Sequence, residues 1–198
     1  MIFGSARASD MARAVKVLID MDPRQDVDRP PTEPEGYIEL GVLKNKGARS
    51  DVHRRLLLPI VSPLISLSGA KWWESWQEAR LALGLGTTGL LDKPIMCRFD
   101  AEGCAVDQTM TASEIREFIR QTLGLETKQR NKVRSHSCKA TILSWLAKFG
   151  TELPLRRLIG HHLDPAARSA EIYARDSMAP AVRVVAEMLN AVKSGSFT

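Results

Sequence analysis

The chain contains 198 residues, of which 44% are hydrophobic, so it can bury one substantial core, and an entirely disordered protein is excluded. Its formal net charge of +5 suits a polyanionic partner but does not require one. The sequence has no run of about 18 apolar residues and no N-terminal signal pattern, so we expect neither a membrane-spanning nor a secreted protein.

The first predicted element is a helix from Ser9 to Met21. Ser9 or Asp10 can cap its N-terminus, and apolar residues follow at helical spacing, namely Met11, Val15, Leu18 and Ile19. The next stretch, from Asp22 to Gly36, contains four prolines and many charges, which neither a helix interior nor a central strand tolerates. We therefore predict a short helix followed by a loop.

Two short segments rich in Ile, Leu and Val come next, from Tyr37 to Leu43 and from Arg54 to Val61. A basic stretch that contains a glycine separates them and carries Lys44 and Lys46. This pattern predicts two strands of a small antiparallel sheet, with both lysines on the connecting loop.

A tryptophan-rich helix is predicted after the sheet and is ended by glycine at Gly84. Three tryptophans fall on one helical face: Trp72, Trp73 and Trp76. This spacing indicates core residues, although one of them could instead stack on a nucleic-acid base. Short strands are expected near Ile95 and Val106.

The second half of the chain is predicted to be helical. Thr111 and Glu114 form a capping box that opens a helix ending at Gly124. Apolar stripes and helix-end signals predict four more helices, at Ser135–Phe149, Leu155–Ile159, Pro165–Tyr173 and Ser177–Lys193. The expected fold is therefore mainly α with a small antiparallel β-sheet (α+β), and residues 1–198 are expected to form a single domain.

Basic residues concentrate in two stretches of the sequence. No acidic residue lies between Glu126 and Glu152, and the second stretch surrounds Asp51. Such concentrations of charge are what neutralising the phosphates of a nucleic acid would need. The candidate DNA-binding residues are Lys44, Arg49, Lys128, Arg130, Lys132 and Arg134.

The three cysteines, Cys97, Cys104 and Cys138, are odd in number and widely spaced, which disfavours a disulfide framework. They indicate a reducing, intracellular setting, which would be the nucleus in a eukaryote. Cys97 and Cys104 have no second Cys or His pair at zinc-ligand spacing. We therefore expect two small, partly buried thiols and no metal site.

Three stretches stand out by their order and separation: Ser135–Lys139 (SHSCK), Leu158–His162 (LIGHH) and Ile172–Arg175 (IYAR). They resemble the C-terminal half of tyrosine recombinases and phage integrases, which carry an H-x-x-R pair on a helix, an L-G-H turn and then a tyrosine. Upstream, Ala6–Asp10 (ARASD) resembles the motif of the family's first catalytic arginine, and Lys44–Lys46 resembles the loop of its β-hairpin lysine. The local sequence is most similar to the crypton-like recombinases of eukaryotic mobile elements.

The resemblance implies a catalytic domain that breaks and rejoins DNA, in recombination or integration, through a 3′-phosphotyrosine and without a cofactor. Tyr173 would be the nucleophile. The other implied catalytic residues supply charge, proton acceptance and proton donation: Arg7, Lys139 and His161 at the phosphate, His136 at the tyrosine proton, and Lys46 at the leaving 5′ oxygen.

Some features depart from the family's pattern. Lys139 stands where the family usually has arginine, and a lysine cannot make the planar two-pronged contact of a guanidinium. Tyr173 lies twelve residues after His161, further than in bacterial relatives, and His162 is an alternative to His161. Because the chain begins close to Arg7, we expect the family's N-terminal core-binding domain to be absent. The family also implies a homo-oligomer on DNA.

Two other functions are compatible with these residues. A domesticated or truncated remnant of a recombinase would act only as a DNA-binding module, so its DNA binding would survive Tyr173→Phe. An unrelated helical interaction domain would carry the stretch near Arg130 as a solvated surface. Its DNA affinity would then not respond to charge reversal at Lys132 and Arg134.

Overall fold

A computed structural model of the chain describes residues 5–23, 34–42, 58–130, 132–134, 136–160 and 178–197, apart from the side chains of residues 58, 59, 127 and 128. These residues form a mixed α+β fold around a small antiparallel sheet, as predicted. Within the described ranges, no helix combines the length and the apolar character needed to cross a bilayer.

The central sheet has four antiparallel strands in the order β3-β2-β1-β4. The strands are β1 (Ala14–Met21), β2 (Gly36–Val42), β3 (Leu58–Pro63) and β4 (Gly89–Leu90). The two predicted strands are confirmed as β2 and β3, which pair directly, while residues 54–57 and the lysine-bearing loop lie outside the described residues. The sheet is larger than predicted because β1 and β4 join it.

The predicted helix from Ser9 to Met21 is wrong. The chain forms only the five-residue helix α1 (Ala8–Ala12) and then continues as β1. The apolar spacing in this stretch fits a helix, but its β-branched residues also alternate as in a strand: Val15, Val17 and Ile19. Pairing with β2 along the whole of β1 decides between the two patterns, and a local pattern does not contain that long-range contact.

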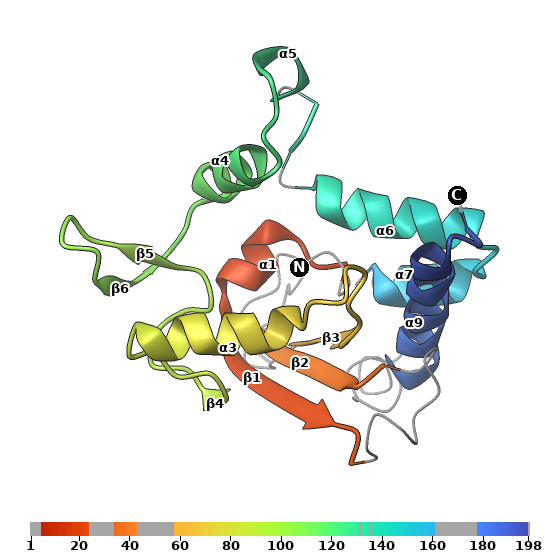
Figure 1. Ribbon diagram of the computed structural model, residues 1–198, viewed down its shortest axis with the longest axis horizontal. Coiled ribbons are helices and arrows are strands. Elements are labelled where there is room, and N and C mark those ends of the chain that lie inside the picture. Colours follow the sequence, from red (N-terminus) through yellow and green to blue (C-terminus); the bar gives the residue numbers. More distant parts are fainter. Residues whose placement is uncertain are drawn as a thin grey trace, which may run out of the picture.

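The tryptophan-rich helix is confirmed as α3 (Trp72–Ala82), with Gly84 in the left-handed region just beyond its end. It lies across the sheet (Figure 1). Trp73 is 2% exposed and packs in one core with sheet residues such as Val17 and Leu40. Trp72 and Trp76 are partly buried at the margin of that core, so packing against the sheet explains all three tryptophans.

A β-hairpin and two helices extend to one side of the sheet (Figure 1). The hairpin consists of β5 (Cys97–Phe99) and β6 (Ala105–Thr109), close to the strands predicted near Ile95 and Val106. Next come α4 (Ala112–Thr122) and the single turn α5 (Thr127–Arg130). The predicted capping box of α4 is confirmed, because the Glu114 amide donates to Thr111 Oγ1 and the Thr111 amide donates to the Glu114 carboxylate. Cys97 is buried, whereas Cys104 on this hairpin is exposed rather than partly buried as expected.

Three helices form a second core on the other side of the sheet (Figure 1). They are α6 (Ser137–Lys148), α7 (Leu153–Ile159) and α9 (Ala179–Ser194), and they confirm three of the predicted helices. Their fully buried residues include Ile142, Leu146, Met188 and Leu189. Val61 of β3 packs with Met178 and Val182, which fixes α9 against the sheet. The helix predicted at Pro165–Tyr173 lies outside the described residues.

Candidate functional site

Arg7 stands at the start of α1 and is held there by local hydrogen bonds. Its carbonyl oxygen accepts the amides of Asp10 at 3.0 Å and Met11 at 3.1 Å, and its side chain is half-buried. Ala8 and Ala12 of α1 pack against Ile115 of α4 in a small apolar cluster. The position of Arg7 therefore depends on α4, which is far from it in the sequence.

Lys139 lies in the first turn of α6 and is only 6% exposed. Its Nζ donates a hydrogen bond to the carbonyl oxygen of Gly160, the residue that ends α7 and directly precedes His161. Burial lowers the pKa of Lys139 to about 8, and the charge of Arg7 lowers it as well, whereas the carboxylate of Asp10 opposes both.

Arg7 and Lys139 are far apart in the sequence, but the structure places them close enough for the charge of Arg7 to act on Lys139. Asp10 is 8% exposed, and its Oδ1 has no hydrogen-bond partner among the described residues. A buried ammonium beside a guanidinium is unfavourable unless negative charge compensates it. The Asp10 carboxylate supplies one negative charge to the two cations, so the cluster stays net positive, and its chemistry is compatible with an anion such as phosphate.

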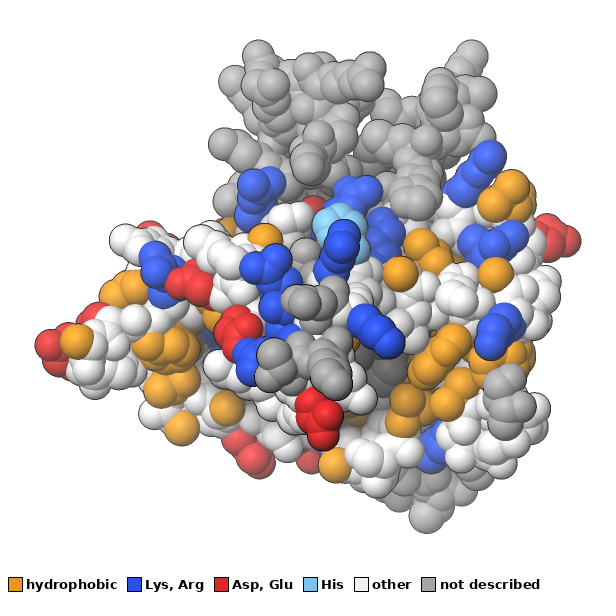
Figure 2. All heavy atoms as spheres, turned by 90° about the horizontal axis from the view of Figure 1, so that it is seen from above, with side chains coloured by type: hydrophobic (Ala, Val, Ile, Leu, Met, Phe, Trp, Pro, Cys, Tyr) orange, Lys and Arg blue, Asp and Glu red, His pale blue; other side chains and the backbone are white. Residues whose placement is uncertain are grey.

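Further Lys and Arg side chains gather on the face of the molecule seen from above, where a histidine lies among them (Figure 2). Lys132, Arg134 and His136 are all exposed, in the stretch that leads into α6. The predicted basic stretch is therefore a solvent-facing surface that continues toward the buried Lys139.

Arg130 differs from its neighbours because a carboxylate already pairs with it. Its guanidinium makes a close ion pair with Glu117 of α4, and Arg120 lies 3.9 Å from the other oxygen of the same carboxylate. Arg120 also donates to the carbonyl oxygen of Val133 at 3.2 Å. These contacts tie the basic stretch to α4, and a DNA phosphate would have to compete with Glu117 for Arg130.

Several predicted site residues lie outside the described residues: Lys44, Lys46, Arg49, His161, His162 and Tyr173. The backbone of Lys128 belongs to α5, but its side chain is outside as well. Their roles stay predictions. Among the described members of the implied catalytic set, Arg7 and Lys139 come together, and His136 directly precedes the helix that carries Lys139.

Sequence reasoning missed two contributors to the cluster. Asp10 was considered only as a helix cap, and the available signal was its position three residues after Arg7 at the start of a short helix. Gly160 contributes a backbone carbonyl, which no side-chain pattern reports, and the glycine before a histidine pair was the only hint.

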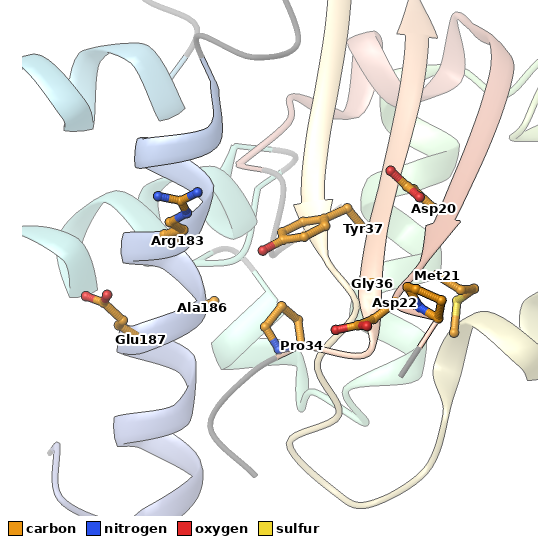
Figure 3. Close-up of a pocket in the computed structure, with 10 residues that line it drawn as sticks. Asp20, Met21, Asp22, Pro34, Gly36, Tyr37, Arg183, Ala186 and Glu187 are labelled. Atoms are coloured by element: carbon orange, nitrogen blue, oxygen red, sulfur yellow. The ribbon is translucent and has the colours of Figure 1, made fainter. Parts of the chain in front are cut away.

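A separate pocket of about 510 Å³ lies between the β1–β2 end of the sheet and α9 (Figure 3). Tyr37 and Pro34 point from the sheet toward α9, and Asp20, Arg183 and Glu187 belong to the lining (Figure 3). The pocket lies at the opposite end of β1 from Arg7, and none of the predicted site residues that the structure describes lines it. It is therefore distinct from the Arg7–Lys139 cluster.

Comparisons with protein-family models, with curated proteins and with solved structures found no match to this chain.

Proposed function

We propose that this chain is a catalytic domain of the tyrosine recombinase type, which cuts and rejoins double-stranded DNA with Tyr173 as nucleophile. The observation that carries the proposal is the electrostatic interaction between Arg7 and the buried Lys139, two of the implied phosphate-binding residues, which are 132 positions apart in the sequence. Further support comes from the hydrogen bond of Lys139 to Gly160, because the next residue is the implied catalytic histidine, His161. An unrelated helical domain gives no reason for these motifs to meet.

In the proposed reaction, the Tyr173 oxygen attacks phosphorus, and the bond between phosphorus and the 5′ oxygen breaks. The tyrosine proton passes to His136, and Lys46 protonates the leaving 5′ oxygen. Arg7 binds the non-bridging oxygens, whose negative charge grows in the transition state. The phosphotyrosine conserves the bond energy, so the reverse attack by a 5′ hydroxyl rejoins the strand.

The test is to trap the covalent adduct. Wild-type protein is incubated with a pool of nicked DNA duplexes of randomised sequence, and the products are separated under denaturing conditions. We expect an adduct with wild type and none with Tyr173→Phe. The chain contains only one other tyrosine, so Tyr37→Phe is the matched control and should retain the adduct.

An adduct that survives Tyr173→Phe would refute the assignment of the nucleophile. Salt-sensitive DNA binding without any adduct would instead favour a DNA-binding module that has lost catalysis.

A further inference from the structure

The ammonium of Lys139 points toward the backbone of another helix. Phosphate-binding lysines ordinarily present a hydrated ammonium to their ligand. Here Lys139 is 6% exposed, and its Nζ donates to the Gly160 carbonyl oxygen. We propose that Lys139 is a positioning residue: it fixes the end of α7, which directly precedes His161 in the sequence, and it leaves the phosphate to Arg7. This inference rests on the proposed function.

The end of α7 needs such a contact. The helix has seven residues, too few to be stable on their own, and the carbonyl groups of its last turn have no partners within the helix. Gly160, the C-cap of this helix, has φ of −72° and offers its carbonyl oxygen to Lys139. A cation at a helix C-terminus also interacts favourably with the helix dipole.

The rest of α6 is rigid enough to hold Lys139 in this position. Ile142 and Leu146 follow Lys139 at spacings of three and seven residues, so the three side chains share one face of α6. Both apolar residues are fully buried in the core that also contains Ile159, the last residue of α7. The lysine and its acceptor are therefore attached to two helices that pack on each other.

Arg7 is better suited than Lys139 to bind the phosphate. Its side chain is half-buried rather than buried, and its planar guanidinium can contact two oxygens at once. The positive charge of Lys139 still favours an anion nearby, but one of its three N–H donors bonds the Gly160 carbonyl, and its burial limits the access of a ligand to the other two. The two cations therefore have separate roles: Arg7 binds the phosphate, and Lys139, at the family's arginine position, positions the end of α7.

The experiment compares Lys139→Met with Lys148→Met, an exposed lysine at the end of the same helix. Hydrogen exchange is measured first, without DNA, at the amide of Gly160, which donates to the Arg156 carbonyl oxygen at 2.9 Å. We expect Lys139→Met to accelerate this exchange by about tenfold, because the last turn of α7 loses its anchor. Lys148→Met should leave it unchanged.

The second readout is the salt dependence of binding to random-sequence duplex DNA. A lost phosphate contact lowers the slope of log affinity against log salt by about 1. We expect this decrease for Arg7→Met, and a change of less than about 0.5 for Lys139→Met. An exchange rate unaffected by Lys139→Met, or a slope that falls by about 1 in this variant, would overturn the inference.

The exchange measurement does not depend on DNA. A wild-type protein that shows no salt-dependent DNA binding would refute the proposed function, while the exchange rates would still decide whether Lys139 anchors α7.

Discussion

Arg80 and Lys139 are both buried cations, but the groups that surround them differ. Arg80 is 5% exposed, and its guanidinium donates to the carbonyl oxygens of Gly86 at 2.7 Å, Ile95 at 3.4 Å and Pro94 at 3.5 Å. It also lies over the ring of Trp76, 5.6 Å from the ring centre.

Lys139 is equally buried, but it has one carbonyl acceptor and a second cation, Arg7, beside it. Burial lowers the pKa of Arg80 as it lowers that of Lys139, and acidic neighbours oppose the shift in both cases, namely the Cys97 thiol and the Asp92 carboxylate at Arg80 and the Asp10 carboxylate at Lys139. The difference is that a second cation, Arg7, acts on Lys139. The carbonyl acceptors of Arg80 Nε and Nη1 tie this cation into the fold, while its Nη2 has no partner among the described residues. The net positive charge around Lys139 instead favours an anion.

The largest effect that follows from this comparison concerns stability. Arg80→Met should lower the free energy of unfolding by about 3 kcal/mol, because it leaves several carbonyl groups without their charged donor. Lys139→Met should change it by less than about 1 kcal/mol, because the lost hydrogen bond is offset by relief from the burial of a charge beside Arg7. Chemical denaturation of both variants measures the difference, and equal losses would remove the distinction between the two cations.

A second, smaller effect is a dependence of stability on pH. Lys139 has a pKa of about 8 in the folded chain, against an ordinary value of 10.5. Between these values the unfolded chain binds more protons than the folded one, so the contribution of Lys139 to stability rises with pH, by about 3 kcal/mol in total.

The measurement is the midpoint of urea unfolding between pH 7 and pH 10, compared with Lys139→Met. The difference between wild type and variant should shift in favour of wild type as pH rises. A difference that stays constant across this range would show that the pKa of Lys139 is not lowered.

The smallest effect concerns Arg130, whose charge is half-exposed and already paired with Glu117. Such pairs contribute about 1 kcal/mol or less to stability. Glu117→Gln should therefore barely alter unfolding, but it should raise DNA affinity a few-fold because it frees Arg130 and removes a negative charge from the basic surface. Glu114→Gln is not a suitable control, because Glu114 caps α4. The control is Glu187→Gln, since Glu187 is exposed and belongs to α9. Glu187→Gln should leave DNA affinity unchanged. An equal gain in affinity in both variants would contradict the competition between Glu117 and DNA for Arg130.

The elements that could be predicted are those with their signals in the local sequence. The capping box at Thr111 and the apolar stripes of α6 and α9 are such signals, and their helices form where expected. The stretch from Ser9 to Met21 fits both the helical spacing and the alternation of a strand. Its long-range pairing with β2 is what makes most of it a strand.

The candidate site also has one part that the sequence predicts and another that depends on packing. The residue types at Arg7 and Lys139 pointed to phosphate chemistry, but the burial of Lys139 and its contact with Gly160 depend on how α6 and α7 pack. No sequence pattern predicts a role for Arg80, because its carbonyl acceptors lie in a loop between six and fifteen residues further along the chain.

The central claim is that Arg7 binds an anion beside the buried Lys139, and thermal unfolding in the presence of inorganic pyrophosphate tests it most directly. An anion that binds only the folded chain raises its Tm as the concentration increases. The account predicts that wild type and the exposed neighbour variant Arg13→Met are stabilised, and that Arg7→Met is not. Equal stabilisation of Arg7→Met and wild type would contradict it.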